Sequence, residues 1–156
     1  MNNHGIKIVL VSPEIPWNTG AIGRTCVALG AELIVIKPTL IDFSDKAVKR
    51  AGLDYWQYVQ LKIYEDWSDF IAKESPKNES LFFLSTKAKT TYYEAGYKQG
   101  SYLVFGAESK GLPSFYHETY ADRFFKLPMF SEHIRSLNLA NTATAVAYEA
   151  LRQISY

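Results

Sequence analysis

Short apolar runs that alternate with helical segments are the feature that most limits which fold this chain can adopt. Five runs rich in β-branched and aromatic residues are almost continuously apolar, which is typical of strands buried on both faces of a parallel sheet. They cover residues 6–12, 32–38, 81–86, 102–106 and 123–128. Between them, helical patterns cover residues 19–29, 45–52, 66–74, 114–120 and 137–154. The alternation predicts an α/β fold, a mostly parallel sheet flanked by helices, with ligands bound beyond the carboxyl ends of the strands.

A sixth run, residues 58–65, has a different pattern. Val59, Leu61 and Ile63 alternate with polar residues, which predicts a strand at the edge of the sheet. The 156 residues, of which 47% are hydrophobic and 21% charged, suffice for one globular core. We see no repeat and no linker, and therefore expect a single domain over residues 1–156.

The compartment is predicted from three negative features of the sequence. No run of about 18 apolar residues is present, so we expect no membrane span. The N-terminus has no basic region followed by a long apolar stretch, so it does not resemble a secretory signal. The single cysteine, Cys26, excludes an internal disulfide and a cysteine-based zinc site. Together these features predict a cytoplasmic protein with no membrane partner.

The net charge is only +1, from 17 basic and 16 acidic residues. A protein that holds nucleic acid by charge alone is usually more basic. If this chain binds RNA, its positive charge must be concentrated locally or supplied by two chains together. The three histidines have no metal-ligand spacing to one another, and we expect no metal site.

The segment 13–32, "PEIPWNTGAIGRTCVALGAE", follows the first predicted strand. Asn18 is a suitable N-cap for a helix whose positive end faces the ligand-binding edge of the sheet. On that helix Arg24 falls nearly opposite the apolar positions Ile22 and Cys26, and Gly30 ends it. An ordinary capped helix with a solvated arginine explains these facts equally well. Cys26, on the apolar face, is expected to be a core residue and not a nucleophile.

The segment 102–113, "YLVFGAESKGLP", ends an apolar run and mixes two glycines with Glu108 and Lys110. It is not a phosphate-binding P-loop, because Gly111 is followed by leucine instead of lysine. Glycines at both ends allow a close approach of the backbone to a ligand, or a positive φ. A surface turn with an exposed Glu and Lys is the alternative.

The segment 135–154 predicts a long helix with Ser136 as its N-cap. Asn138 and Asn141 stand near its start, although asparagine amides compete with the helix for backbone hydrogen bonds. Capping explains one asparagine at most, whereas a ligand or a partner chain could explain both.

Taken in order, three stretches of this chain resemble the motifs of the SPOUT methyltransferases. They are "PEIPWNTGAIGRTC", "FGAESKGLP" and "LPMFSEHIRSLNLANTATAVAYEALRQ", with "KRAGLDYWQY" between the first and the second. The resemblance covers nearly the whole chain and is greatest to the small TrmL type, which acts on the ribose 2′-hydroxyl of the wobble nucleotide, cytidine or a modified uridine, in leucine tRNAs. It implies a SPOUT-type sheet with a deep C-terminal trefoil knot, S-adenosylmethionine as cofactor, tRNA as partner, and a homodimer whose active sites use both chains.

The resemblance also assigns site residues. It implies a cofactor pocket made by Leu84, Thr86, Gly106, Glu108, Leu127, Met129, Ser136 and Leu137, with the backbone at Gly106 close to the cofactor. It places Asn18, Lys110, Asn138 and Asn141 toward the RNA, with Glu108 and Lys110 on the dimer or RNA side. Arg24, the arginine of the first motif, is implied to be the catalytic residue.

A guanidinium is a poor base, because its pKa lies above about 12. We therefore expect Arg24 to orient the ribose hydroxyl and phosphate and to stabilise developing charge. The proton acceptor is left open. Trp17 replaces the small residue or proline usual in the family, which could bear on the nucleotide accepted, and Lys110 replaces a common arginine, losing its bidentate geometry.

Three alternative functions compete with this prediction. A SPOUT enzyme acting on another RNA or position, and a non-catalytic RNA-binding protein on the same knot, both remain open. A flavodoxin-like nucleotide binder is disfavoured, because both phosphate-binding motifs are missing.

Overall fold

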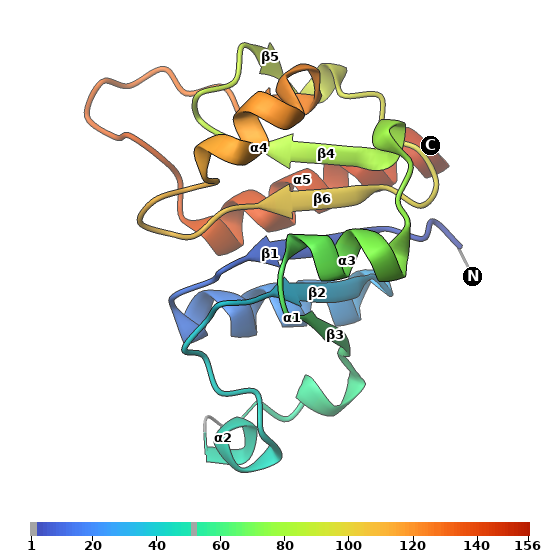
Figure 1. Ribbon diagram of the computed structural model, residues 1–156, viewed down its shortest axis with the longest axis vertical. Helices are drawn as coiled ribbons and strands as arrows, with labels where there is room; N and C mark the ends of the chain where they lie inside the picture. The colour runs from blue at the N-terminus through green and yellow to red at the C-terminus, as the bar shows by residue number, and fades with distance from the viewer. Residues whose placement is uncertain (1–2, 51–52) are drawn as a thin grey trace.

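The computed structural model describes residues 3–50 and 53–156 and shows one layered α/β unit (Figure 1). Its seven strands are β1 (Lys7–Val11), β2 (Glu32–Ile36), β3 (Gln60–Tyr64), β4 (Leu81–Leu84), β5 (Thr90–Thr91), β6 (Tyr102–Phe105) and β7 (Phe124–Lys126). Its α-helices are α1 (Pro16–Leu29), α2 (Asp45–Arg50), α3 (Trp67–Glu74), α4 (Ser114–Thr119) and α5 (Leu139–Ser155). Short 3-10 turns cover Trp56–Tyr58, Asn78–Ser80, Tyr92–Glu94 and Ala121–Arg123. All six predicted strands and all five predicted helices are present, with the last two positions of the predicted helix 45–52 outside the described residues.

The strands form one sheet in the order β3-β2-β1-β6-β4-β7-β5, and every pairing within it is parallel. The expected α/β fold is therefore confirmed, and β3 lies at an edge as its alternating pattern predicted. β5 is a two-residue strand, too short to leave a pattern in the sequence. Strand order reverses between β1 and β6, and ligands of parallel sheets bind beside such a reversal.

Helices cover both faces of the sheet. In Figure 1, α1 and α5 lie behind the sheet, and α3 and α4 lie in front of it. Alternate residues of β1 serve the two layers: Ile8 and Leu10 join the core under α1 and α5, while Val9 and Val11 join the aromatic core under α3 and α4. Because both faces are buried, the strands had to be apolar throughout, which is why they stood out in the sequence.

The two helices that carry the first and third motifs begin differently from what we expected. α1 begins at Pro16, with Ile15 in the capping position, so Asn18 is inside the first turn and is not the cap. α5 begins at Leu139 and is capped by Asn138, whose side chain accepts from the Asn141 N–H, so Ser136 is not the cap either. Proline suits the first helical position because its missing N–H would have no helical partner there.

The long segment 127–138 leaves β7, extends beyond the carboxyl ends of the strands and returns to α5 (orange, at the left of Figure 1). In the described part of the chain, no helix is long and apolar enough to cross a membrane. The trefoil knot implied by the resemblance stays a prediction.

Candidate functional site

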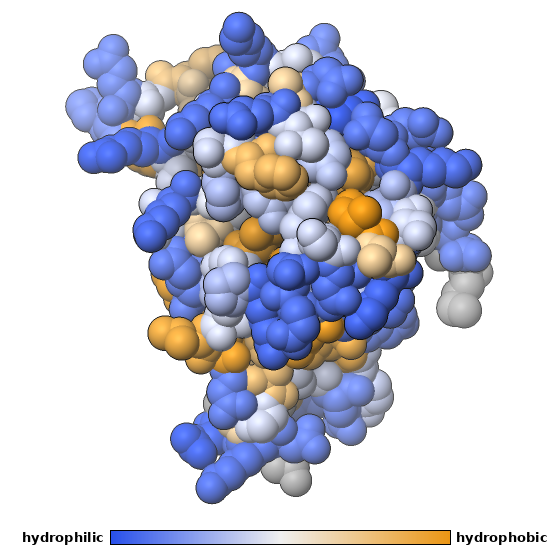
Figure 2. Space-filling model, viewed as in Figure 1, coloured by the Kyte–Doolittle hydropathy of each residue, from blue (hydrophilic) through white to orange (hydrophobic). Residues whose placement is uncertain are grey.

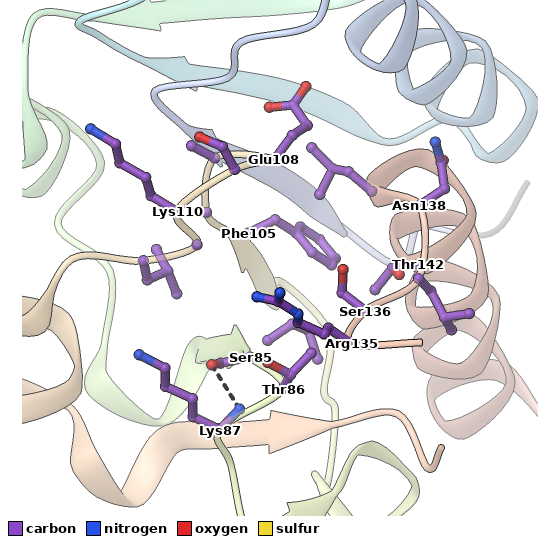
Figure 3. A pocket seen from close by; sticks show the side chains of 18 of the residues that line it. Ser85, Thr86, Lys87, Phe105, Glu108, Lys110, Arg135, Ser136, Asn138 and Thr142 are labelled. Carbon is purple, nitrogen blue, oxygen red and sulfur yellow. Dashed lines mark hydrogen bonds between the residues drawn. The ribbon is translucent and has the colours of Figure 1, made fainter. Parts of the chain in front are cut away.

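A cavity of about 740 Å³ lies at the carboxyl ends of β4, β6 and β7. At this cavity the start of the first-motif segment, around Ile15 and Asn18, meets the 106–112 loop and the 127–138 segment (Figure 3). The eight residues predicted to surround a cofactor all line it: Leu84, Thr86, Gly106, Glu108, Leu127, Met129, Ser136 and Leu137. Asn18, Lys110 and Asn138 line it as well. One cavity thus joins residues from four separate parts of the sequence.

Contacts within the chain itself explain why residue 106 is a glycine. A Cβ atom at this position would lie 2.2 Å from the carbonyl carbon of Gly111 and 2.3 Å from the nitrogen of Leu112. The loop closes on itself through the Gly111 N–H, which donates to the Ala107 carbonyl at 2.8 Å. Gly111 has a φ of +67°, in the left-handed region that favours glycine. The two glycines therefore permit a tight loop that forms one wall of the cavity.

Glu108 ties this loop to the start of α1. Its carboxylate accepts from the backbone N–H groups of Glu14, at 2.9 Å, and Ile15, at 2.8 Å. These donors lie just before the helix, where a negative charge also interacts favourably with the helix dipole. The reverse contact is made by Glu14, whose carboxylate accepts from the Ser109 N–H at 2.8 Å and hydroxyl at 2.7 Å. The Ser109 N–H donor lowers the pKa of Glu14 below its usual value.

The carboxylate of Glu108 is thus engaged within its own chain, toward the first-motif loop. The further prediction that Glu108 lies on the side of a dimer partner or RNA stays a prediction.

A chain of side-chain amides extends this link to the third motif. Asn18, only 4% exposed, donates to Glu108 at 3.3 Å and accepts from the Asn138 amide at 3.1 Å. Asn138 in turn accepts from the Asn141 N–H at 3.1 Å. The asparagine Asn138 is therefore explained by capping together with the contact to Asn18. Asn141 contributes its backbone N–H, while its side chain is exposed and lies outside the residues that line the cavity.

Positive charge is concentrated at the cavity. Lys87, Lys110, Lys126 and Arg135 line it, and we call these four residues the basic rim. Figure 3 shows Lys87, Lys110 and Arg135 around the opening. Within residues 3–50 and 53–156, no member of the rim forms an ion pair. A chain with a net charge of +1 can therefore still present a locally basic surface to an anionic partner.

Sequence reasoning missed several lining residues, among them Ser85, Lys87, Phe105, Arg135 and Thr142. Most are immediate neighbours of predicted site residues, so widening each motif by one position would have found them. Among the described residues, no group of three or more histidine, cysteine, aspartate or glutamate side chains could hold a metal ion.

Arg24 lies apart from this cavity within the single chain. It is exposed on α1, opposite the buried Ile22 and Cys26 as predicted, and its guanidinium carbon lies 5.4 Å from the centre of the Tyr55 ring. It lines a second cavity, between α1 and residues of the ranges 41–47 and 53–56. Cys26 is fully buried in the core, as predicted, and this burial raises the pKa of its thiol to about 12.

The model of the SpoU rRNA Methylase family matches residues 5–148. The chain belongs to this family. Among its relatives, a tRNA (cytidine(34)-2′-O)-methyltransferase of Burkholderia cenocepacia is 39% identical over 96% of each chain. One of the same name from Saccharophagus degradans is 41% identical, again over 96% of each chain. The resemblance to the TrmL type of SPOUT methyltransferase is thereby confirmed.

Solved structures agree with the family. A Bacillus anthracis protein superposes with a TM-score of 0.91 at 41% identity, covering 97% of this chain and 96% of that chain. A structure described as giving insights into the 2-OH methylation of C/U34 on tRNA superposes with a TM-score of 0.83 at 39% identity, covering 97% of both chains.

Proposed function

We propose that this protein transfers a methyl group from S-adenosylmethionine to the ribose 2′-hydroxyl of the wobble nucleotide, cytidine or a modified uridine, of leucine tRNAs. The observation that carries the proposal is the single cavity at the strand ends, built by all three motif segments and braced by Glu108, Asn18 and Asn138. Relatives that match nearly the whole chain act on cytidine 34 of tRNA. We assign the activity to one domain, residues 1–156, acting in the cytoplasm.

S-adenosylmethionine is the cofactor of this family, and the lining of the cavity fits it. Leu84, Phe105 and Leu127 form an apolar floor that suits an adenine ring. Hydroxyls of Thr86 and Ser136 can bond polar edges of the nucleoside, and the basic rim can attract the carboxylate of the amino-acid part. When bound, the cofactor supplies an electrophilic methyl group on a sulfonium centre.

Arg24 is our proposed catalytic residue. A ribose hydroxyl is a weak acid, so its attack on the methyl group requires a base or stabilisation of the developing negative charge. A guanidinium stays protonated, and Arg24 therefore orients the hydroxyl and the adjoining phosphate and stabilises the charge on the oxygen. Holding the reactants in line at about 3 Å supplies much of the acceleration.

The position of Arg24 supports a homodimer. Within one chain Arg24 lines a cavity other than the cofactor cavity. We propose that a second copy brings its own Arg24 to the cofactor cavity, so that each active site uses both chains. Exposed apolar side chains around the first and third motifs are available for the interface: Ile15 at 45%, Trp17 at 80%, Leu137 at 45% and Tyr148 at 50% exposure. The face turned to the viewer in Figure 2 carries apolar side chains only in small groups.

We assign RNA contact to four residues, Asn18, Lys110, Asn138 and Asn141. Lys110, Asn138 and Asn141 are exposed, and Lys110 belongs to the basic rim. RNA backbone crossing this rim would bring phosphates to otherwise unpaired cations.

The test uses purified protein, labelled S-adenosylmethionine and total tRNA, followed by nucleoside analysis. We expect 2′-O-methylcytidine or the methylated form of a modified uridine at the wobble position of leucine tRNAs. Absence of 2′-O-methylation in every tRNA would refute the function, and methylation of another position or RNA would identify a different enzyme of the family.

Arg24→Ala separates catalysis from folding and binding. We expect loss of methyl transfer while cofactor affinity, measured by calorimetry, stays as in the wild type. If transfer and cofactor binding were lost together, Arg24 would be a structural residue. Sedimentation of the wild type gives the oligomeric state, for which we expect a dimer.

A further inference from the structure

The exposed side chain of Arg24 must be held in a definite position if it is to act on a ribose. Arginine has many rotamers, and a misplacement of about 1 Å can cost about 100-fold in rate. Within residues 3–50 and 53–156, Arg24 forms no ion pair. In this part of the chain, the ring of Tyr55 is the only aromatic ring that makes a cation–π contact with it, at 5.4 Å from the guanidinium carbon. The Tyr55 ring is therefore the contact that can restrict the guanidinium.

Tyr55 is itself fixed to α1, independently of Arg24. Its hydroxyl donates to the Gly20 carbonyl at 2.8 Å, one helical turn before Arg24. The next residue, Trp56, rests on the same turn: a Cβ on Gly23 would lie 2.5 Å from the indole ring, so the glycine makes room for it. Two neighbouring residues of the chain are thus attached to the turn of α1 that carries Arg24.

The hydroxyl bond of Tyr55 is maintained at neutral pH. Burial raises the pKa of Tyr55, and the charge of Arg24 lowers it by less. The hydroxyl therefore keeps the proton that it donates to Gly20, and the ring keeps its place on the helix.

A contact with a ring suits a guanidinium that acts on a substrate better than a salt bridge does. A carboxylate partner would occupy N–H donors and offset the positive charge, whereas the face of a ring does neither. Asp54, next to Tyr55 in the chain, forms no ion pair with Arg24. The charge and the donors of Arg24 are thus left for a ribose oxygen and a phosphate.

We propose that Tyr55 is a positioning residue for methyl transfer, which holds the Arg24 guanidinium where the ribose hydroxyl reacts. The ring limits the positions of the guanidinium, and the hydroxyl bond to Gly20 keeps the ring on α1. Because both residues belong to one chain, the pair exists before RNA binds and reaches the cofactor cavity of a second copy as one unit. This inference rests on the proposed function, in which Arg24 is the catalytic residue.

The experiment measures the single-turnover rate of methyl transfer by the whole protein, with saturating S-adenosylmethionine and the tRNA that the wild type methylates. Tyr55→Leu removes the aromatic face and keeps an apolar side chain, whereas Tyr55→Phe keeps the face and removes the hydroxyl. A cation–π contact changes the population of the held conformer by about 2-fold to 30-fold. We expect the rate to fall by about fivefold or more in Tyr55→Leu and by less than about threefold in Tyr55→Phe, with cofactor affinity in calorimetry unchanged.

A second readout follows the Arg24 side chain directly by NMR of the isotopically labelled protein. The ring current of Tyr55 displaces the Nε–H resonance of Arg24, which is assigned by its absence in Arg24→Ala. We expect Tyr55→Leu to move this resonance to the position of a solvated arginine, and Tyr55→Phe to keep most of the displacement.

Tyr58→Leu is the matched control, because it makes the same change three positions later. The Tyr58 side chain is 67% exposed, and its ring makes no cation–π contact with Arg24. This variant should keep both the wild-type rate and the wild-type Arg24 resonance.

A Tyr55→Leu rate within about twofold of the Tyr58→Leu rate would overturn the inference. A slower rate with the Arg24 resonance unmoved would do the same. So would a slower rate accompanied by loss of the dimer in sedimentation or by loss of cofactor binding, because Tyr55 would then act on assembly or folding. Wild-type protein that methylates no RNA refutes both this inference and the proposed function, whereas methylation that stays intact in Tyr55→Leu refutes the inference alone.

Discussion

Glu108→Ala tests whether the hydrogen bonds that join the three motifs through Glu108, Asn18 and Asn138 contribute to stability and to cofactor binding. In the wild type this carboxylate accepts two backbone N–H groups just before α1 and one amide from Asn18. Loss of a capping acceptor costs about 0.5–2 kcal/mol, and loss of a negative charge at a helix N-terminus about 0.3–1 kcal/mol. Both backbone contacts are exposed to solvent, so we expect a total of about 1–2 kcal/mol, or a melting temperature lower by about 3–6 °C.

The same substitution should weaken cofactor binding without touching the cofactor floor. Asn18 loses its acceptor, and Asn138, which depends on Asn18, is no longer held at the cavity wall. We expect S-adenosylmethionine affinity to fall by about tenfold in titration calorimetry, which corresponds to about 1.4 kcal/mol.

Glu118→Ala is the control, because it removes an exposed carboxylate on α4 that takes no part in the hydrogen bonds of Glu108, Asn18 and Asn138. It should leave both quantities unchanged. A Glu108→Ala protein that melts with the wild type and binds the cofactor equally well would refute the argument that this carboxylate organises the site.

Three further predictions follow from other parts of the fold. Gly106→Ala would place a Cβ against the backbone of Gly111 and Leu112, so we expect the free energy of unfolding, measured by chemical denaturation, to fall by about 3 kcal/mol or more. Gly30→Ala is the control: its Cβ would meet open space, and its positive φ should cost only about 1 kcal/mol. Burial raises the pKa of Glu74, but hydrogen bonds from Tyr64 and Tyr102 and the nearby Lys62 lower it by more, so the carboxyl has a depressed pKa in the folded state. The contribution of Glu74 to stability is then complete above the unfolded pKa near 4.5 and is lost as pH falls through the folded pKa. Glu74→Gln should therefore make the melting temperature depend less on pH between about pH 5 and pH 3, and an unchanged dependence would contradict this. Removing Lys110 and Arg135 together should reduce the slope of log affinity for tRNA against log salt by about 1.5–2, and an unchanged slope would exclude them from phosphate contact.

Much of the fold could be predicted from local pattern. Strands such as β1 are buried on both faces, so their residues had to be apolar, and the run 6–12 was visible without any structure. The eight residues assigned to the cofactor cavity came from the motifs and meet in one place because parallel strands end at one edge of the sheet.

The features that could not be predicted depend on pairs of residues far apart in the chain. Asn18 was expected to cap α1, but the backbone N–H groups just before that helix donate to Glu108, which lies 90 positions after Asn18 in the chain. Local sequence shows that a cap is needed and cannot show that a distant loop supplies it. The position of Arg24 is similar, because the cavity that it lines also involves residues of the ranges 41–47 and 53–56, which come later in the chain.

Wobble methylation by this protein is tested most directly by nucleoside analysis of leucine tRNAs purified from cells that lack the protein and from cells in which it has been restored. We expect 2′-O-methylation of the wobble nucleotide to disappear in the first and to return in the second, and we expect the gene encoding Arg24→Ala not to restore it. Wobble methylation that persists in the cells lacking the protein, with no other 2′-O-methylation lost, would contradict the proposed function.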